Sequence, residues 1–261
     1  MTTEWPKISL VTAVYNGEMY LAETLASIRS QNYPNLEYIV YDGGSTDGTL
    51  QILEQNRDLI SILVSEKDQG MYDALYKGFA RATGEIFGWI GADDLLMPWC
   101  LRTVAKYFIK NRGCQWVTGI PTKFDGNGNM IWVNPITPHY RRSWIRRRWY
   151  SSFGLGVIQQ ESTYFKRDLY EKAGGLQTCM RFKIAGDFDL WCRFAEHAEL
   201  RQLGVYIAGY RFHGANAGAA FDNYIKEGRL VKIPCGLALG DFYSIASMIM
   251  SKLHRRGVDN C

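Results

Sequence analysis

The chain has 261 residues, of which 47% are hydrophobic and 21% are charged, and its formal net charge is +4. This length provides for a sizeable core in one large domain or two small ones, and the mild basic excess does not indicate a nucleic-acid-binding protein. Six scattered cysteines, without a CxxC pair or a zinc-type histidine spacing, are typical of reduced packing residues. No signal peptide and no run of about 18 apolar residues occurs, so we expect a cytoplasmic protein without a spanning helix.

The first hundred residues alternate between two kinds of pattern. Apolar, β-rich runs predict strands at 8–15, 37–42, 60–65 and 85–90. Helical spacing of apolar residues predicts helices at 18–31, 46–56, 71–83 and 98–111. Strand–helix alternation with short connections is typical of a mostly parallel sheet with helices on both faces. We therefore expect an α/β fold with a Rossmann-like sheet.

The regular alternation of predicted strands and helices ends after about residue 113. A Gly/Asn turn between apolar runs predicts a hairpin at 124–133, hence a smaller antiparallel element, and residues 134–156 look irregular. The remaining expected elements are strands at 114–120 and 205–213, a strand followed by a short helix within 159–175, and helices at 188–197, 219–232 and 237–254. Without a repeat or a linker, one compact domain is the simplest interpretation.

Polar residues follow three of the predicted strands at their carboxyl ends, where open parallel sheets bind ligands. These segments are TAVYNG (12–17), YDGGSTDGT (41–49) and GADD (91–94). Asp93 and Asp94 place two like charges at the edge of a buried strand, where solvent or a cation has to relieve their repulsion. The alternative is that they cap the next helix.

These segments, in this order, resemble the inverting glycosyltransferases of family 2, which have the GT-A fold. The similar stretches are VTAVYNG, YDGGSTDGT, EKDQGMYDALYKGFARATGE and GADD, followed by QQESTYFKRDLYEKAGGL (159–176) and AGDFDLW (185–191). The resemblance implies a single GT-A domain over 1–233, with a nucleotide-sugar-binding half (1–112) and an acceptor and catalytic half (113–233). An amphipathic helical tail would follow at 234–261.

The resemblance also implies roles for acidic residues. Asp94 would bind the metal, and Asp93 would face the ribose of the nucleotide. Mn²⁺ or Mg²⁺ suits carboxylate and diphosphate oxygens and neutralises the leaving group. Asp187 would be the catalytic base, because inversion needs a carboxylate that accepts the proton of the acceptor hydroxyl. An N-cap role is the alternative for Asp187, and Asp189 is the alternative base.

Further positions would contact the nucleotide-sugar: Thr12, Ala13, Tyr15, Asp42 and Asp73. An aromatic side chain such as Tyr15 could stack on the base, although plain packing is an alternative. Asp42 could accept from the base or the ribose, or could instead be a turn residue that caps a helix. His213 would be a third ligand of the metal or a contact of the diphosphate, with a structural role as the alternative.

Two departures from the family pattern bear on the substrates. Tyr76 and Gly91 stand where relatives often have Asn, which leaves the donor sugar open. The QxxRW signature of processive synthases is missing after Asp187, so we expect single additions.

The segment HYRRSWIRRRWYSSF (139–153) interleaves arginines with Trp144, Trp149 and Tyr150, and the tail at 237–256 is apolar and then basic. Exposed aromatics with arginines suit a lipid headgroup layer or an acceptor diphosphate. We therefore expect a peripheral contact with the inner face of the cell membrane and a lipid-linked acceptor. The alternatives are a solvated basic loop and a tail that packs on the domain.

Taken together, the sequence predicts a metal-dependent, non-processive hexosyl- or N-acetylhexosaminyltransferase. It would transfer a sugar from a UDP-sugar to a hydroxyl of a glycan or lipid-linked glycan, in a bacterial O-antigen or capsule pathway. A non-catalytic nucleotide-sugar-binding scaffold of the same fold is the alternative. A nucleotidyltransferase would want a Gly-rich loop with Arg or Lys after the first strand, and VYNGEMY offers none.

Overall fold

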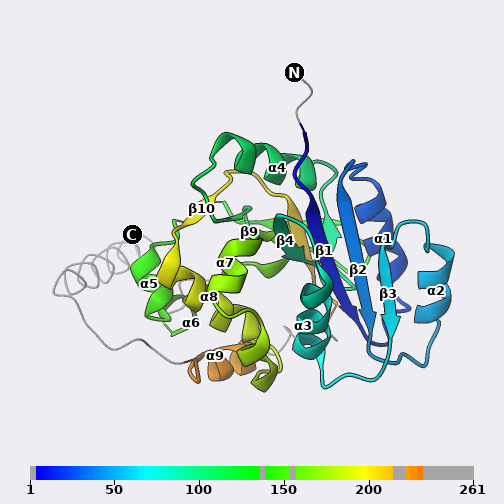
Figure 1. Cartoon of the computed structure of the whole chain (residues 1–261). Coiled ribbons are helices and arrows are strands. Elements are labelled where there is room, and N and C mark those ends of the chain that lie inside the picture. The colour runs from blue at the N-terminus through cyan, green and yellow to red at the C-terminus, as the bar shows by residue number, and fades with distance from the viewer. Residues whose placement is uncertain (1–3, 136–138, 153–156, 214–220, 232–261) are drawn as a thin grey trace, which may run out of the picture.

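A seven-stranded sheet forms the centre of the molecule (Figure 1). The computed structural model describes residues 4–135, 139–152, 157–213 and 221–231. The strands, in spatial order, are β10 (Leu200–Gln202), β6 (Trp116–Thr118), β9 (Thr163–Lys166), β4 (Ile86–Trp89), β1 (Ile8–Val14), β2 (Leu36–Asp42) and β3 (Ile62–Ser65). Only β9 runs antiparallel to its neighbours among these strands, which confirms the expected mostly parallel sheet.

Helices cover both faces of this sheet because alternate residues of each central strand point to opposite sides. In β1, Leu10 belongs to the core beneath α1 (Leu21–Arg29), α2 (Thr49–Gln55) and α4 (Cys100–Lys110). The next residue, Val11, belongs to the core shared with α3 (Met71–Arg81), α7 (Arg167–Lys172) and α8 (Gly186–His197). The expected two-sided α/β architecture is therefore confirmed.

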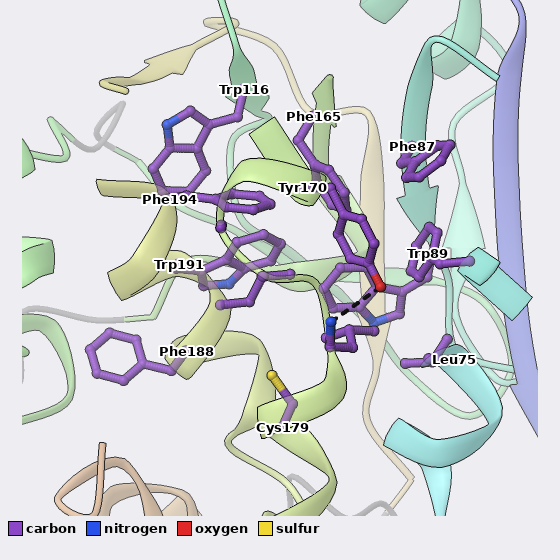
Figure 2. Packing of buried hydrophobic residues seen from close by; sticks show 14 of the residues in the cluster. Leu75, Phe87, Trp89, Trp116, Phe165, Tyr170, Cys179, Phe188, Trp191 and Phe194 are labelled. Atoms are coloured by element: carbon purple, nitrogen blue, oxygen red, sulfur yellow. Dashed lines mark hydrogen bonds between the residues drawn. The ribbon is translucent and has the colours of Figure 1, made fainter. Parts of the chain in front are cut away.

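Aromatic stacking fixes α8 against the sheet. The ring of Trp191 stacks between Trp89 and Trp116, with centroids 5.3 and 5.7 Å away, and Phe194 packs on the same cluster (Figure 2). Asp187 precedes Trp191 by four residues and so lies on the same side of the helix, one turn earlier. The packing that orients Trp191 therefore also sets the direction of Asp187.

A second, four-stranded sheet has the order β5 (Leu95–Leu96), β11 (Ala208–Arg211), β7 (Thr122–Phe124) and β8 (Met130–Val133). Its strands are antiparallel except for the β11–β7 pair, which is parallel. The β7–β8 hairpin confirms the predicted turn, in which Asp125 Oδ1 accepts the backbone N–H groups of Asn127 and Asn129, both over 2.9 Å. The smaller sheet is thus the expected second element, with one parallel pair added.

Several short elements were not predicted. The two-residue β5 and the three-residue β10 are too short to show a hydrophobic period, and they form because β11 and β6, respectively, pair with them. The segment expected to be irregular contains α5 (Arg142–Arg146) and α6 (Trp149–Ser152). The remaining unpredicted elements are η1 (Gln160–Ser162) and η2 (Gln177–Arg181), whereas α9 (Phe221–Gly228) lies within the helix predicted at 219–232. The helix expected at 237–254 lies outside the described residues.

The expected exposure of the aromatic residues at 139–153 is wrong. Trp149 and Tyr150 of α6 are buried, because α6 packs on α5 and α9, and α5 in turn packs on α8. Arg142 donates to two carbonyl groups near the end of α8, and Arg146 pairs with Glu196 over 2.7 Å. The arginine–aromatic pattern therefore serves intramolecular packing here and gives no support to a membrane contact.

Within the part of the chain that the structure describes, no helix is both long and apolar enough to cross a bilayer. The cysteines in this part, Cys100, Cys114, Cys179 and Cys192, are free thiols. Three of them are buried, as expected for packing residues.

Candidate functional site

The loops that follow β1, β2 and β3 lie side by side. Asn16 donates its backbone N–H to Ser45 Oγ over 2.8 Å, and its side-chain Oδ1 accepts the N–H of Thr46 over 2.9 Å. Gly43 lies against the third loop, because a Cβ atom on it would come within 2.7 Å of Asp68 Oδ2. Hydrogen bonds and close backbone approach thus assemble one polar edge at the carboxyl ends of the strands.

Asp42 is 1% exposed at the end of β2. Its carboxylate accepts the N–H of Gly44 and of Ser45, each over 3.1 Å, and the hydroxyl of Ser65 over 2.6 Å. These bonds hold the Gly-rich turn and join it to β3. Asp42 therefore shapes the turn, and it does not cap α2, which begins at Thr49.

The three positions predicted on β1 differ in exposure. Thr12 is fully buried, and its Oγ1 accepts the hydroxyl of Tyr38 over 3.0 Å. Ala13 is half-buried against the core that α3 shares. Tyr15 is 64% exposed at the tip of the strand and is free to meet a ligand. Of the three, only Tyr15 presents a large side chain at the surface.

Asp73 lies in the first turn of α3 and is buried. Its Oδ2 accepts the N–H of Gln69 over 3.0 Å and pairs with Lys77 over 3.1 Å. Gly70 begins the helix at φ +115°, a conformation that favours glycine. Asp73 thus ties the loop after β3 to α3, next to the polar edge.

Asp93 and Asp94 sit in a turn that opens at Gly91. Asp94 is 4% exposed, whereas the side chain of Asp93 is 33% exposed. A Cβ atom at position 91 would lie 2.6 Å from Asp94 Oδ2 and 2.9 Å from Asp93 Oδ1. The absence of a side chain at Gly91 therefore leaves room for both carboxylates to lie against the backbone at this position. The helix-capping alternative is excluded, because β5 intervenes and α4 begins only at Cys100.

Arg211, which sequence reasoning missed, holds this acidic turn. It is fully buried, its backbone N–H donates to Asp94 Oδ1 over 2.9 Å, and its Nε donates to the carbonyl of Asp93 over 2.6 Å. The same guanidinium donates to the Gly126 carbonyl over 3.0 Å and pairs with Glu23 over 2.7 Å. The available signal was an arginine at an inward position of the apolar strand that precedes His213.

His213 lies beside Asp93 and not beside Asp94, with which the sequence had grouped it. Its Nε2 is 2.9 Å from Asp93 Oδ2, and its ring packs on Tyr20. Among the described residues, no three or more His, Cys, Asp or Glu side chains form a ready metal cage. Mg²⁺-type sites commonly use one or two carboxylates and complete their coordination with substrate phosphates. The two adjacent carboxylates fit such an ion.

Asp94 has a second acidic neighbour in Glu161, which sequence reasoning also missed. Glu161 is 4% exposed, and its Oε1 has no hydrogen-bond partner among the described residues. Burial, and then the nearby Asp93, raises the pKa of Asp94 well above its usual value. Burial, and then Asp94, likewise raises the pKa of Glu161. The only sequence signal was an acidic residue inside an otherwise buried stretch, QQESTYF.

Asp187 lies in the first turn of α8 and is 8% exposed. Its Oδ1 accepts the N–H of Phe188 over 2.7 Å, and its Oδ2 accepts the hydroxyl of Tyr224 over 3.3 Å. Burial raises the pKa of Asp187 to about 7, against the opposing effect of these two hydrogen bonds. A carboxyl group with this pKa exchanges a proton near neutral pH.

Asp189 points to another part of the molecule. It pairs with Arg181 over 3.1 Å and with Arg193 over 3.0 Å, and it also accepts from Thr178. These partners line a separate cavity beside α8. Asp189 is therefore engaged in ion pairs, whereas Asp187 accepts hydrogen bonds from the neutral groups of Phe188 and Tyr224.

A pocket of about 280 Å³ brings the acidic residues together. Its carboxyl groups are those of Asp94, Glu161 and Asp187, which come from the turn after β4, from η1 and from α8. The other polar side chains that line it are Lys123, Gln159, Gln160, Tyr210 and Tyr224. The turn after β4 and the start of α8, far apart in the sequence, thus face one space.

A mostly parallel sheet with a smaller second sheet, and a pocket at the strand ends lined by buried carboxyl groups, defines the class of GT-A-fold glycosyltransferases. Residues 9–174, more than half of the chain, match the model of Glycosyl transferase family 2. The chain belongs to this family, and it is a glycosyltransferase.

Known proteins agree with this assignment. EpsE of Bacillus subtilis (strain 168), named as a glycosyltransferase, is 28% identical over 98% of this chain and 95% of its own length. The crystal structure of S. aureus TarS with UDP-GlcNAc has a TM-score of 0.65 at 18% identity, covering 82% of this chain and 61% of that one. The mannosyltransferase PcManGT from Pyrobaculum calidifontis, in complex with GDP-Man and Mn²⁺, has a TM-score of 0.61 at 20% identity, covering 89% and 67%. At these identities the two structures show a common fold.

Proposed function

We propose that this enzyme is an inverting, metal-dependent and non-processive transferase that moves a sugar from a nucleotide diphosphate donor to a hydroxyl of a glycan acceptor. The observation that supports it best is that Asp94 and Asp187 line one pocket, while Asp189 is held in ion pairs outside it. The pocket therefore has one acidic group, Asp94, for the donor and another, Asp187, for the acceptor.

On the acceptor side, Asp187 is the catalytic base. It takes the proton of the acceptor hydroxyl as that oxygen attacks the anomeric carbon of the donor. The bond between this carbon and the diphosphate oxygen breaks on the opposite face, and the nucleoside diphosphate leaves. A pKa of about 7 suits the task, because Asp187 can then accept the proton at neutral pH.

On the donor side, Asp94 and Asp93 would hold Mn²⁺ or Mg²⁺ against the diphosphate, with Arg211 fixing their turn. When bound, such an ion neutralises charge on the leaving group. The exposed Tyr15 meets the nucleotide, in the edge that Asp42 and Asp73 shape. The metal in PcManGT and the UDP-sugar in TarS support this assignment, and we take a UDP-sugar as the donor.

We extend the proposal to a glycan or lipid-linked glycan of a bacterial surface pathway as the acceptor, with the reaction on the cytoplasmic side of the membrane. A peripheral membrane contact would involve 237–256, which lies outside the described residues.

The proposal is tested by calorimetry with a panel of UDP- and GDP-sugars, with and without Mn²⁺. We expect one donor to bind much more tightly with Mn²⁺, and a disaccharide product whose new bond has the opposite anomeric configuration by NMR. Absence of binding by every donor would remove the nucleotide-sugar assignment. A product that keeps the configuration of the donor would remove the inverting mechanism and the role of Asp187.

A further inference from the structure

Glu161 is a buried carboxyl group of the pocket that the mechanism above does not use. It belongs to η1, the short 3₁₀ turn that leads into β9, and it lines the same pocket as Asp94 and Asp187. It is 4% exposed, and its Oε1 finds no hydrogen-bond donor in the part of the chain that the structure describes. A buried polar atom without a partner is rare in folded proteins and calls for a reason.

The residues around Glu161 are, in contrast, tied to the scaffold. The side-chain amide of Gln159 exchanges two hydrogen bonds with the backbone of Thr122, over 2.8 and 2.7 Å. Gln160 Nε2 donates to the last carbonyl of β4 over 2.5 Å, and the hydroxyl of Ser162 donates to the Gln159 carbonyl over 3.2 Å. A firmly anchored turn thus presents a carboxyl group whose Oε1 has no hydrogen-bond donor among the described residues, an arrangement suited to binding a ligand.

The position of Glu161 indicates which part of a ligand it meets. Its carboxyl group is close enough to both Asp94 and Asp187 for each to oppose its ionisation. In the proposed reaction, the diphosphate lies at Asp94 and the attacking hydroxyl lies at Asp187. The sugar that passes from one to the other occupies the space between them, and Glu161 lines this space.

We propose that Glu161 accepts a hydrogen bond from a hydroxyl or acylamino N–H group of the transferred sugar and so helps to select the donor. This inference rests on the proposed function. A site whose buried polar group needs a substrate hydroxyl discriminates strongly against an analogue that lacks it, because the group is then left without a partner.

The first test compares ligands that carry the sugar with ligands that lack it. Glu161→Met keeps the approximate size of the side chain and removes both oxygens, and Glu161→Gln keeps one acceptor oxygen. Glu171→Gln, in an exposed pair with Arg167, is the matched control. Calorimetry with Mn²⁺ and no acceptor measures binding of the nucleoside diphosphate and of the preferred nucleotide-sugar.

We expect Glu161→Met to weaken nucleotide-sugar binding by roughly 10- to 100-fold and to leave nucleoside diphosphate binding unchanged, because a hydroxyl or N–H group of the bound sugar then loses its hydrogen-bond partner. Glu161→Gln should fall between Glu161→Met and the wild type. Equal weakening of both ligands, unchanged binding of both, or an effect confined to the KM of the acceptor would overturn the inference.

The second test uses the free enzyme. If the buried Oε1 of Glu161, which has no donor among the described residues, serves a ligand, its burial costs stability when no ligand is bound, and Glu161→Met should raise the melting temperature of the ligand-free protein. A structural role predicts a lower melting temperature, which would overturn the inference. The proposed function fails if the wild type binds no nucleotide-sugar. If the wild type transfers sugar and Glu161→Met does so equally well with unchanged sugar selectivity, only the inference on Glu161 fails.

Discussion

The hydroxyl group of Tyr224 donates a hydrogen bond to Oδ2 of Asp187 over 3.3 Å and so joins α9 to the first turn of α8. A second contact strengthens this connection. The carboxylate of Glu227, one turn further along α9, accepts the backbone N–H groups of Lys183, Ile184 and Ala185 over 3.1, 2.9 and 3.1 Å. Helix α9 therefore holds the segment that carries the proposed base, from a position about 40 residues later in the chain.

Substitution of the proposed base separates chemistry from binding. Asp187→Asn should lower the transfer rate on the order of 10²- to 10⁴-fold, because the amide cannot accept the proton of the acceptor hydroxyl. Calorimetric affinity for the nucleoside diphosphate with Mn²⁺ should stay at the wild-type value. Asp168→Asn, on the exposed side of α7, is the control. Wild-type transfer rates in Asp187→Asn would assign the base elsewhere.

The raised pKa of Asp187 has two consequences for pH dependence. The base is active when ionised, so kcat should rise with pH and level off above about 7, measured from pH 5.5 to 9. The folded-state pKa lies above the unfolded one, so protonation favours folding, and this contribution is lost as pH rises through about 7. Asp187→Asn should therefore melt at a higher temperature than the wild type at pH 8 and show no such gain below pH 4. A flat rate profile across pH 7 would contradict the assignment.

Removing the phenol hydroxyl of Tyr224 should shift the dependence of kcat on pH. The hydrogen bond from Tyr224 favours the ionised form of Asp187, so Tyr224→Phe should shift the acid limb of kcat to higher pH. At pH 9 the rate should approach the wild-type rate, since the base is then ionised in both proteins. Tyr206→Phe, which removes a hydroxyl away from the pocket, should leave the profile unchanged. A uniform loss of rate at every pH would indicate that Tyr224 acts on packing alone.

Arg211 should be essential to both stability and the acidic turn. Arg211→Met leaves the carbonyl groups of Asp93 and Gly126 without their donor and removes the partner of Glu23. We expect a loss of about 2 to 6 kcal/mol in the free energy of unfolding, measured by urea denaturation, because two carbonyl groups lose their hydrogen-bond donor. Arg211→Lys keeps the charge but lacks the planar, forked donors, and should recover only part of the loss. Arg201→Lys in β10 is the exposed control.

Asp94 should determine the response to metal. Asp94→Asn replaces a charged oxygen ligand by a neutral amide of the same shape, so the increase in nucleotide affinity on adding Mn²⁺ should disappear. Affinity without metal should remain near the wild-type value, because the fold and the nucleotide edge are unchanged. Calorimetry with added Mn²⁺, and separately with a metal chelator, measures the nucleotide affinity of the metal-loaded and the metal-free protein. A full Mn²⁺ response in Asp94→Asn would move the metal to other ligands.

The local sequence pattern was sufficient to predict the buried central strands and the amphipathic helices. The buried strands β1, β2 and β4 and the helices α3 and α4 carry their hydrophobic period in their own residues, so each could be found by inspection. The short β5 and β10 could not, because their pairing partners lie elsewhere in the chain. Trp149 and Tyr150 of α6 were misjudged as exposed for a similar reason, since α5 and α9 pack against this helix.

The sequence by itself determined the α/β order, the polar strand ends and, through ordered motifs, the family. Tertiary structure alone decided which acidic groups share a pocket. It brought Glu161 and Arg211 to the GADD turn, paired His213 with Asp93, and set Asp187 and Asp189, two residues apart, in different surroundings. The physical reason is that the sequence gives the chemical type of each side chain. The burial of that side chain, the charges near it and its hydrogen-bond partners depend on which other residues the fold places beside it.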